Sequence, residues 1–232
     1  MEQKDLKSKN LLLRCFPQKD WELVHLYAKE VELKTGSILY EPGIKIQYVY
    51  FPINSIIAIQ HVLENGSTAE VCSVGNEGMV GVSVILGGGA SSNRAIVQNA
   101  GSAIQIKSCD LLNVFNNSIP VAHLLFHFTQ AKITQMSQTA VCNRHHSIEQ
   151  QLSRLLLSSL DRLFGNELTI TQEVIGGLLG VRRESVTDAA HRLQHEGYIS
   201  YVRGHITILN RAALEKRTCE CYGVVKKEYE RW

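Results

Sequence analysis

Residues 171–209 (TQEVIGGLLGVRRESVTDAAHRLQHEGYISYVRGHITIL) constrain the fold of this chain more than any other stretch. The stretch opens on Thr171, a residue type that caps helix N-termini well, and apolar residues then recur at helical spacing. Gly180 permits a tight turn, after which a second helix is predicted from about Arg182. The inward face of that helix follows i, i+3, i+4, i+7 spacing, with Val186, Ala189, Ala190 and Leu193. The pattern predicts two short helices joined by a tight turn.

A β-hairpin is predicted directly after the second helix. The sequence YISYVRGHITIL has two short strand patterns with a turn at Arg203-Gly204. Two helices, a tight turn and a hairpin in this order are typical of a winged helix-turn-helix, in which the polar start of the second helix enters the DNA major groove. A plain packing module with solvated charges is the alternative that these features leave open.

The side chains at the start of the second helix have the chemistry for reading DNA. Arginine forks onto guanine, glutamate accepts from the cytosine amino group, and serine and threonine reach phosphates or bases. The candidates on this helix are Arg182, Arg183, Glu184, Ser185 and Thr187, and Arg203 and His205 of the hairpin are candidates for phosphate contact. Residues 171–217 carry seven Lys/Arg and five Asp/Glu, so the prediction depends on the pattern and not on bulk charge.

The first half of the chain has a strand pattern. Many short apolar runs separated by turn residues lie between about 30 and 107, and they predict a sandwich or jelly roll. Within this region, residues 75–93 (GNEGMVGVSVILGGGASSN) hold six of the seventeen glycines. Such a loop either turns tightly or lets its backbone approach a ligand.

A long helix is predicted from Pro120 onward. About 27 residues without further proline or glycine correspond to a helix of roughly 40 Å. Its apolar seam begins with Val121, Leu125 and Phe128 but continues with polar positions, which are Lys132, Gln135 or Met136, and Thr139. A helix face that mixes apolar and polar residues either packs against a sheet or pairs with the same helix of a second copy of the chain. A further helix is predicted after it, with Leu152, Leu155, Leu156 and Leu160 on one face.

The ordered features resemble the Crp/Fnr family, the bacterial regulators related to the cyclic-AMP receptor protein and the fumarate–nitrate regulator. The resemblance is strong in TQEVIGGLLGVRRESVTDAAHRLQHEGYI and architectural in the first 150 residues. It implies an α+β fold with a sensory, cyclic-nucleotide-binding-like β-roll (1–118), a long dimerisation helix (119–147) and a C-terminal winged helix-turn-helix (148–232). The implied function is a homodimeric transcription regulator that reads a palindromic DNA site and contacts or blocks RNA polymerase.

The resemblance also assigns individual residues. Arg183 and Glu184 match the pair that reads bases, and Thr171 and Gln172 match positions that contact the DNA backbone. Asp188 departs from the cyclic-AMP receptor protein, which has an arginine there. This carboxylate either accepts from a cytosine or adenine amino group or is held off by Arg183 or Arg192, so we expect a different target sequence.

The sensory loop matches the nucleotide pocket of that receptor protein poorly. Glu77 precedes Gly78, and Met79 stands where the ribose-binding carboxylate is needed. Arg94 lies in NRA (93–95), where no hydroxyl residue follows it, so a loop-bracing role is expected for it. Losing a buried hydrogen bond to the ribose costs on the order of 1–3 kcal/mol. The effector is therefore expected not to be cyclic AMP, with a cyclic-nucleotide-responsive regulator as the alternative.

The cysteines and histidines favour neither an iron–sulfur cluster nor haem, and the cofactor stays unknown. Cys15 is the only cysteine among the first 71 residues, which argues against an iron–sulfur cluster of the family's type, and the scattered histidines argue against haem. No CxxC pair occurs, and no metal site is predicted. Cys219 and Cys221 form a CxC that is interpreted as two isolated thiols, with a metal or redox role left open.

Other function classes are disfavoured. A cupin-type enzyme needs converging metal ligands, but His61 is the only histidine between residues 30 and 107, and no GxSxG, HExxH or P-loop pattern occurs. No catalytic residue is predicted. The N-terminal sequence MEQKDLKSKN has no apolar signal region, and no apolar run is long enough for a membrane span, so a cytoplasmic protein is expected. A module that acts on a protein partner without binding DNA stays open.

Overall fold

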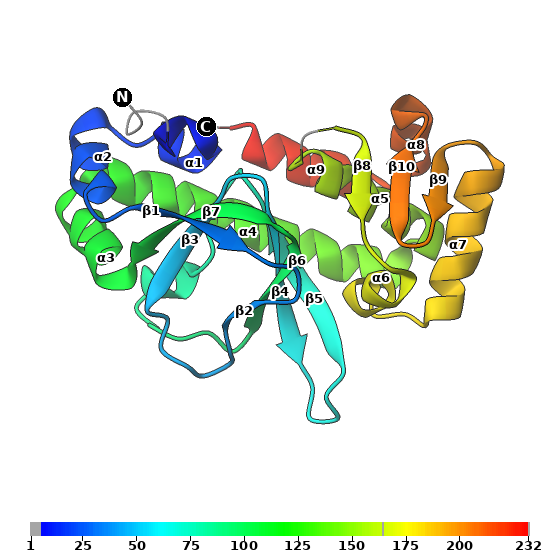
Figure 1. The fold of residues 1–232 in the computed structure, drawn as a ribbon, viewed down its shortest axis with the longest axis horizontal. Coiled ribbons are helices and arrows are strands. Elements are labelled where there is room, and N and C mark those ends of the chain that lie inside the picture. The colour runs from blue at the N-terminus through cyan, green and yellow to red at the C-terminus, as the bar shows by residue number, and fades with distance from the viewer. Residues whose placement is uncertain (1–5, 164, 232) are drawn as a thin grey trace. The chain divides into compact units, whose positions relative to one another are not determined.

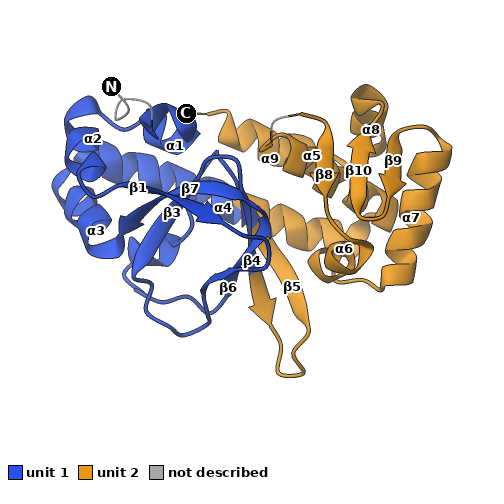
Figure 2. Cartoon of the chain, in the orientation of Figure 1, with its two compact units in different colours: residues 1–59, 73–133, 232 blue, residues 60–72, 134–231 orange. Residues whose placement is uncertain are grey.

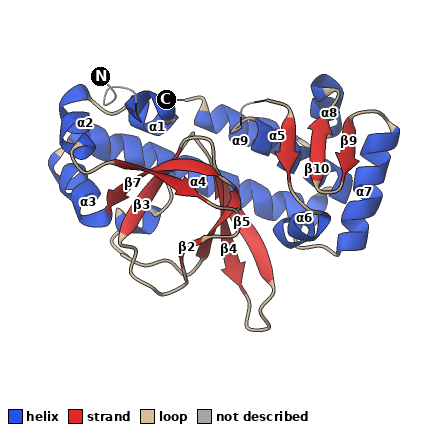
Figure 3. Cartoon of the chain, in the orientation of Figure 1, coloured by secondary structure: helices blue, strands red, loops and turns tan. Residues whose placement is uncertain are grey.

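The computed structural model describes residues 6–163 and 165–231 (Figure 1). Clustering of contacts divides the chain into two units (Figure 2). One unit holds the residues up to 59 together with 73–133, and the other holds 60–72 together with 134–231. The first unit is rich in strands and the second is mainly helical (Figure 3).

The strand-rich part of the chain begins with short helices and continues into two antiparallel sheets. Its elements are η1 (Leu6–Lys9), α1 (Leu11–Arg14), α2 (Gln18–His25), β1 (Lys29–Leu33), β2 (Ile38–Tyr40), β3 (Tyr48–Pro52), β4 (Ile56–Val62), β5 (Thr68–Val74), η2 (Val82–Val84), β6 (Arg94–Asn99), β7 (Gly101–Lys107) and α3 (Ser108–Asn117). One sheet has the order β1-β7-β3 and the other β2-β6-β4-β5. The register of the first runs from Lys29↔Gln105 to Leu33↔Gly101 and from Tyr48↔Lys107 to Pro52↔Ala103.

The core of this part lies between the two sheets. Side chains from both sheets form one buried cluster, with Leu33, Tyr50 and Ala103 from the first and Ile57, Val74, Ala95 and Val97 from the second. The two sheets thus form two packed layers. This arrangement confirms the predicted β-roll.

The helix α4 (Ile119–His145) confirms the predicted long helix, at 27 residues. The seam seen in the sequence is buried against the chain itself, including its polar positions. Lys132 donates from Nζ to the backbone oxygen of Ser73 at 2.7 Å, and Gln135 accepts from the hydroxyl of Tyr229 at 2.9 Å. The polar residues in the seam are therefore explained by hydrogen bonds within the chain.

The helical unit continues from the end of α4 with a three-stranded sheet among five helices. Its further elements are α5 (Ile148–Leu160), β8 (Glu167–Thr169), α6 (Gln172–Leu179), α7 (Arg183–His195), β9 (Ile199–Val202), β10 (His205–Ile208), α8 (Arg211–Arg217) and α9 (Glu220–Tyr229). The sheet order is β8-β10-β9, so β10 pairs with the predicted hairpin partner and also with β8. Among the described residues, none of the helices combines the length and the hydropathy that a membrane crossing requires.

Candidate nucleic-acid interface

The helix α6 begins as its sequence predicts. The hydroxyl of Thr171 accepts a hydrogen bond from the backbone N–H of Val174 at 3.3 Å, which caps the helix. Ile175, Leu178 and Leu179 are buried on its inner face. The helix ends at Gly180, whose φ of 67° lies in the left-handed region that glycine adopts without a steric penalty. This turn sets the direction of the helix that follows.

The helix α7 presents its polar start to solvent. It begins at Arg183, with Arg182 as the N-cap residue, and the four predicted inward residues are buried. Arg182, Arg183, Glu184 and Asp188 are exposed, and Ser185 and Thr187 are partly exposed. The unpaired backbone N–H groups of a helix start attract anions such as phosphate. The segment is thus suited to an approach by DNA.

A hydrogen bond links the starts of α6 and α7. The hydroxyl of Thr187 donates to Oε1 of Gln172 at 2.8 Å and lies 3.1 Å from the backbone oxygen of Arg183. Thr187 and Gln172 are 15 positions apart in the sequence, so their contact depends on the turn at Gly180. The bond fixes the amide plane of Gln172 beside the start of α7.

The hairpin β9–β10 places Arg203 near the same two helix starts. An open depression of about 440 Å³ is lined by Thr171, Gln172, Glu173, Arg183, Tyr201, Arg203 and Gly204. Four of the predicted DNA-binding residues therefore gather around one hollow. Tyr201 was not predicted, and its hydroxyl donates to the backbone oxygen of Ile170 at 2.9 Å. Burial raises the pKa of Tyr201, which keeps this hydroxyl protonated as a donor.

Arg203 has an uncommon backbone conformation. Its φ is 48°, the only positive φ of a non-glycine residue in the described part of the chain, and Gly204 follows with a φ of 84°. Two central residues with positive φ are what a two-residue type I′ hairpin turn requires. The turn holds the guanidinium of Arg203 at the end of the wing at the cost of local strain.

The other six predicted DNA-binding residues do not line this depression, and His205 and Asp188 are two of them. His205 is exposed, and its Nδ1 lies 3.3 Å from the hydroxyl of Thr169 on the neighbouring strand β8. Asp188 is exposed on α7, and Arg192, one of the two arginines considered as its partner, instead pairs with Glu149 at 3.1 Å. The carboxylate of Asp188 therefore faces solvent without Arg192 beside it.

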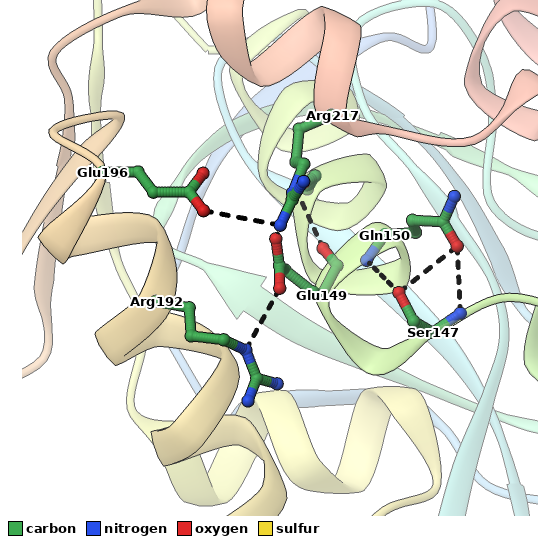
Figure 4. A network of polar contacts seen from close by, with 7 residues as sticks. Ser147, Glu149, Gln150, Arg192, Glu196 and Arg217 are labelled. Atoms are coloured by element: carbon green, nitrogen blue, oxygen red, sulfur yellow. Dashed lines mark hydrogen bonds and ion pairs between the residues drawn. The ribbon is translucent and has the colours of Figure 1, made fainter.

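Glu149 joins three helices behind the interface (Figure 4). Its side chain is only 9% exposed and accepts from Nε of Arg192 on α7 and from Nε of Arg217 on α8. Arg217 also reaches Glu196 at the end of α7, at 3.5 Å. The start of α5, which carries Glu149, is held by a capping box between Ser147 and Gln150. No local pattern marks Glu149 in the sequence, because its partners lie 43 and 68 residues away.

The predicted effector loop is tightly packed. The carboxylate of Glu77 accepts from the backbone N–H of Gly75 at 3.0 Å, and Met79 is 1% exposed. A Cβ added to Gly78 would lie 2.1 Å from the ring of Phe128, so this position requires glycine. Arg94 pairs through Nε with Glu41 at 2.8 Å. Each polar side chain predicted for this loop thus has a partner within the chain.

Comparisons with known proteins agree with this architecture. A model of the cyclic nucleotide-binding domain matches residues 30–118, and a model of the Crp-like helix-turn-helix domain matches residues 150–217. No curated protein sequence matches the chain.

Solved structures resemble the chain over most of its length. A putative transcriptional regulator of the Crp/Fnr family from Eubacterium rectale is 19% identical with a TM-score of 0.70, covering 90% of this chain and 98% of that one. FixK2 from Bradyrhizobium japonicum is 16% identical with a TM-score of 0.67, covering 83% and 98%. The c-di-GMP responsive global regulator CLP from Xanthomonas campestris is 13% identical with a TM-score of 0.65, covering 83% and 99%. At these identities the likeness concerns the fold.

The two family models together match most of the chain, in the order β-roll and then helix-turn-helix. The second model spans the two helices and the wing that carry the polar residues described above. With a cyclic nucleotide-binding domain followed by a Crp-like DNA-binding domain, the chain belongs to the Crp/Fnr family of transcriptional regulators.

Proposed function

We propose that this regulator is a homodimer that reads a palindromic DNA site through α7, with the recognition residues between 182 and 195. The observation that supports this most is the convergence of Thr171, Gln172, Arg183 and Arg203 around one exposed depression. These side chains come from the start of α6, the start of α7 and the end of the β9–β10 wing. This combination suits a curved, anionic surface with readable base edges.

Each residue has a role that follows from its chemistry. Arg183 forks onto the O6 and N7 of guanine, and Glu184 accepts from the amino group of cytosine. Asp188 adds a second acceptor and so changes the preferred sequence. The remaining residues contact phosphates and position the helix, and these are Thr171, Gln172, Arg182, Ser185, Thr187, Arg203 and His205.

An apolar row on α4 supports the dimer. Ile119, Phe126 and Ile133 recur every seven residues and are 72%, 49% and 48% exposed. The buried seam residues Val121 and Phe128 lie about 200° around the helix from Ile119 and Phe126, on the opposite side. A seven-residue repeat of exposed apolar side chains is the pattern by which two helices pair. Residues 119–147 would then place two copies of the 148–232 domain on half-sites about 34 Å apart.

The 1–118 domain is proposed to sense a signal other than cyclic AMP. Met79 is buried where a ribose-binding carboxylate is needed, and Arg94 is engaged by Glu41. Cyclic AMP would have to break that ion pair and would find no acceptor for its ribose. Regulation would follow from contact with RNA polymerase or from blocking its access to the promoter.

Selection from a randomised DNA duplex pool tests the proposal. Purified protein is incubated with the pool with and without cyclic AMP, and the bound duplexes are sequenced. A palindrome enriched equally in both conditions is expected. Enrichment that requires cyclic AMP would overturn the effector proposal and favour the cyclic-nucleotide-responsive alternative.

Substitutions of Arg183 separate base reading from general charge. Arg183→Ala is expected to lose about 1–3 kcal/mol of discrimination between the selected site and a scrambled duplex. Arg183→Lys keeps the charge but lacks the two-pronged donor geometry, so it should retain binding to scrambled DNA while losing the same discrimination. Both variants are compared with the unmodified chain by fluorescence anisotropy at several salt concentrations. A module that acts on a protein partner would show no change in either variant.

A further inference from the structure

Three cysteines and a histidine from distant parts of the chain meet in the helical unit. Cys142 lies in the last turn of α4 and His146 directly follows that helix, while Cys219 and Cys221 flank the start of α9. The four ligand atoms all lie within 4.8 Å of one another. The cysteines are 0%, 4% and 1% exposed, and the histidine side chain is 13% exposed. These four side chains form a nearly buried group of possible metal ligands.

The distances match a tetrahedral metal site. With Zn–S near 2.3 Å and Zn–N near 2.1 Å, two sulfurs of a tetrahedron lie about 3.8 Å apart, and a sulfur and a nitrogen about 3.6 Å. The sulfurs of Cys142 and Cys219 are 3.6 Å apart, and the sulfur of Cys221 is 3.6 Å from Nδ1 of His146. A disulfide would require about 2.05 Å, and all three cysteines are free thiols.

The histidine is oriented as a metal ligand would be. Its Nδ1 faces the sulfur of Cys221, while its Nε2 lies 3.3 Å from a carboxylate oxygen of Glu220. Metal-binding histidines almost always donate their second ring N–H to a carboxylate or carbonyl, which fixes the tautomer and raises the basicity of the ligating nitrogen. Glu220 stands between the two cysteine ligands in the sequence, so it is a positioning residue for the same cluster.

A positively charged side chain lies near the cluster, because the guanidinium of Arg154 acts electrostatically on Cys142. A cation beside the cluster would offset the net negative charge of three thiolates around a divalent metal.

We propose that Cys142, His146, Cys219 and Cys221 bind one zinc ion as a structural site. Three thiolates and one imidazole are a common zinc ligand set, and soft thiolates select zinc over magnesium or calcium. Four protein ligands leave no open position for a substrate, so the site holds the fold together and does not catalyse a reaction.

The site would fasten both ends of the DNA-binding domain. Cys142 and Cys219 are 77 positions apart, and residues 150–217, which match the Crp-like helix-turn-helix, lie between the two ligand pairs. Closing a loop of this length restricts the unfolded chain and so stabilises the folded one. Zinc would therefore join the last turn of α4 to the start of α9 and hold the helix-turn-helix between them.

Metal analysis of the intact protein tests the site directly. Protein expressed with added zinc and purified without chelator is expected to carry one zinc per chain by elemental analysis. X-ray absorption at the zinc edge should show three sulfurs at about 2.3 Å and one nitrogen at about 2.0 Å. Cobalt loaded in place of zinc should give the intense visible absorption of a tetrahedral thiolate complex. None of these three measurements depends on a variant folding correctly, because all use the unmodified chain.

Variants assign the ligands. Cys221→Ser and His146→Asn should lose most of the bound zinc, while Cys109→Ser, at an exposed cysteine outside the cluster, should keep it. Glu220→Gln keeps all four ligands and should weaken zinc binding by roughly 10–100-fold. Removing the metal with a chelator should lower the melting temperature by roughly 5 °C or more.

Metal content can overturn the zinc site in two ways. One is purified protein that takes up less than a tenth of an equivalent of zinc or cobalt even when freshly reduced. The other is zinc content that is unchanged in Cys221→Ser and His146→Asn. A Cys142–Cys219 disulfide in protein purified under anaerobic conditions, detected by mass spectrometry, would likewise replace the metal site with a redox pair.

Discussion

At the scale of single residues, Arg203 combines a strained backbone with an exposed cation. A left-handed conformation costs a non-glycine residue on the order of 1–2 kcal/mol, and asparagine tolerates it better. Arg203→Asn is therefore expected to stabilise the fold by up to about 1 kcal/mol. It should also weaken DNA binding and reduce the slope of log K against log salt by about 1. Urea unfolding and anisotropy titrations at several salt concentrations measure the two effects.

The matched control is Arg203→Lys, which keeps the cation and lacks the conformational preference of asparagine. This variant should bind DNA with the salt slope of the unmodified chain and gain no stability. An unchanged salt slope in Arg203→Asn would mean that the wing does not contact phosphate.

At the scale of elements, a buried carboxylate on α5 supports the helix α7. Glu149 on α5 accepts from Arg192 on α7 and Arg217 on α8, and its side chain is 9% exposed. Glu149→Gln keeps the shape but removes the charge and one acceptor, so the free energy of unfolding should fall by about 1–3 kcal/mol. Specific DNA affinity should fall as well, because α7 loses its support. Urea unfolding at constant ionic strength measures the first effect.

Glu215→Gln is the control for this element. Glu215 pairs with Arg211 at 2.9 Å on the surface of one helix, where such pairs contribute little. Its substitution should change the free energy of unfolding by less than about 0.5 kcal/mol. Equal effects at the two glutamates would show that the burial of Glu149 does not matter.

At the scale of the whole molecule, the exposed row on α4 determines the proposed assembly. Ile133 is 48% exposed, so Ile133→Glu is expected to leave the single chain folded while placing a charge in the helix pair. The variant should sediment as a monomer and lose affinity for a palindrome far more than for a half-site, because the two recognition helices are no longer linked. Ile133→Leu, which keeps the apolar contact, should remain a dimer. A dimeric Ile133→Glu would place the dimer contact elsewhere.

Much of the C-terminal domain could be predicted from the sequence because its signals are local. Thr171 caps a helix whose first hydrogen bonds lie within a few residues, and Gly180 ends that helix by its own backbone freedom. The turn at Arg203-Gly204 and the buried face of α7 likewise depend on short-range periodicity. The structure confirms the start of α6 after Thr171, its end at Gly180 and the start of α7 next to Arg182.

The N-terminal part contains features that local sequence patterns leave ambiguous. The strand pattern predicted a sandwich or jelly roll, the family resemblance implied a β-roll, and the family match confirms the β-roll. The seam of α4 was left open between a sheet and a twin helix, because a polar position such as Lys132 is ambiguous in the sequence alone. Its burial became explicable only when the fold placed the backbone oxygen of Ser73 at 2.7 Å from its ammonium.

The sequence by itself determined the helix-turn-helix, the wing and the long helix, because capping, turn chemistry and periodicity act between neighbours along the chain. The tertiary structure alone decided the partners of Glu149 and the meeting of Cys142 and His146 with Cys219 and Cys221. Each of these contacts joins residues between 43 and 77 positions apart. At such separations a side chain's neighbours are set by how the elements pack, and no local pattern records that packing.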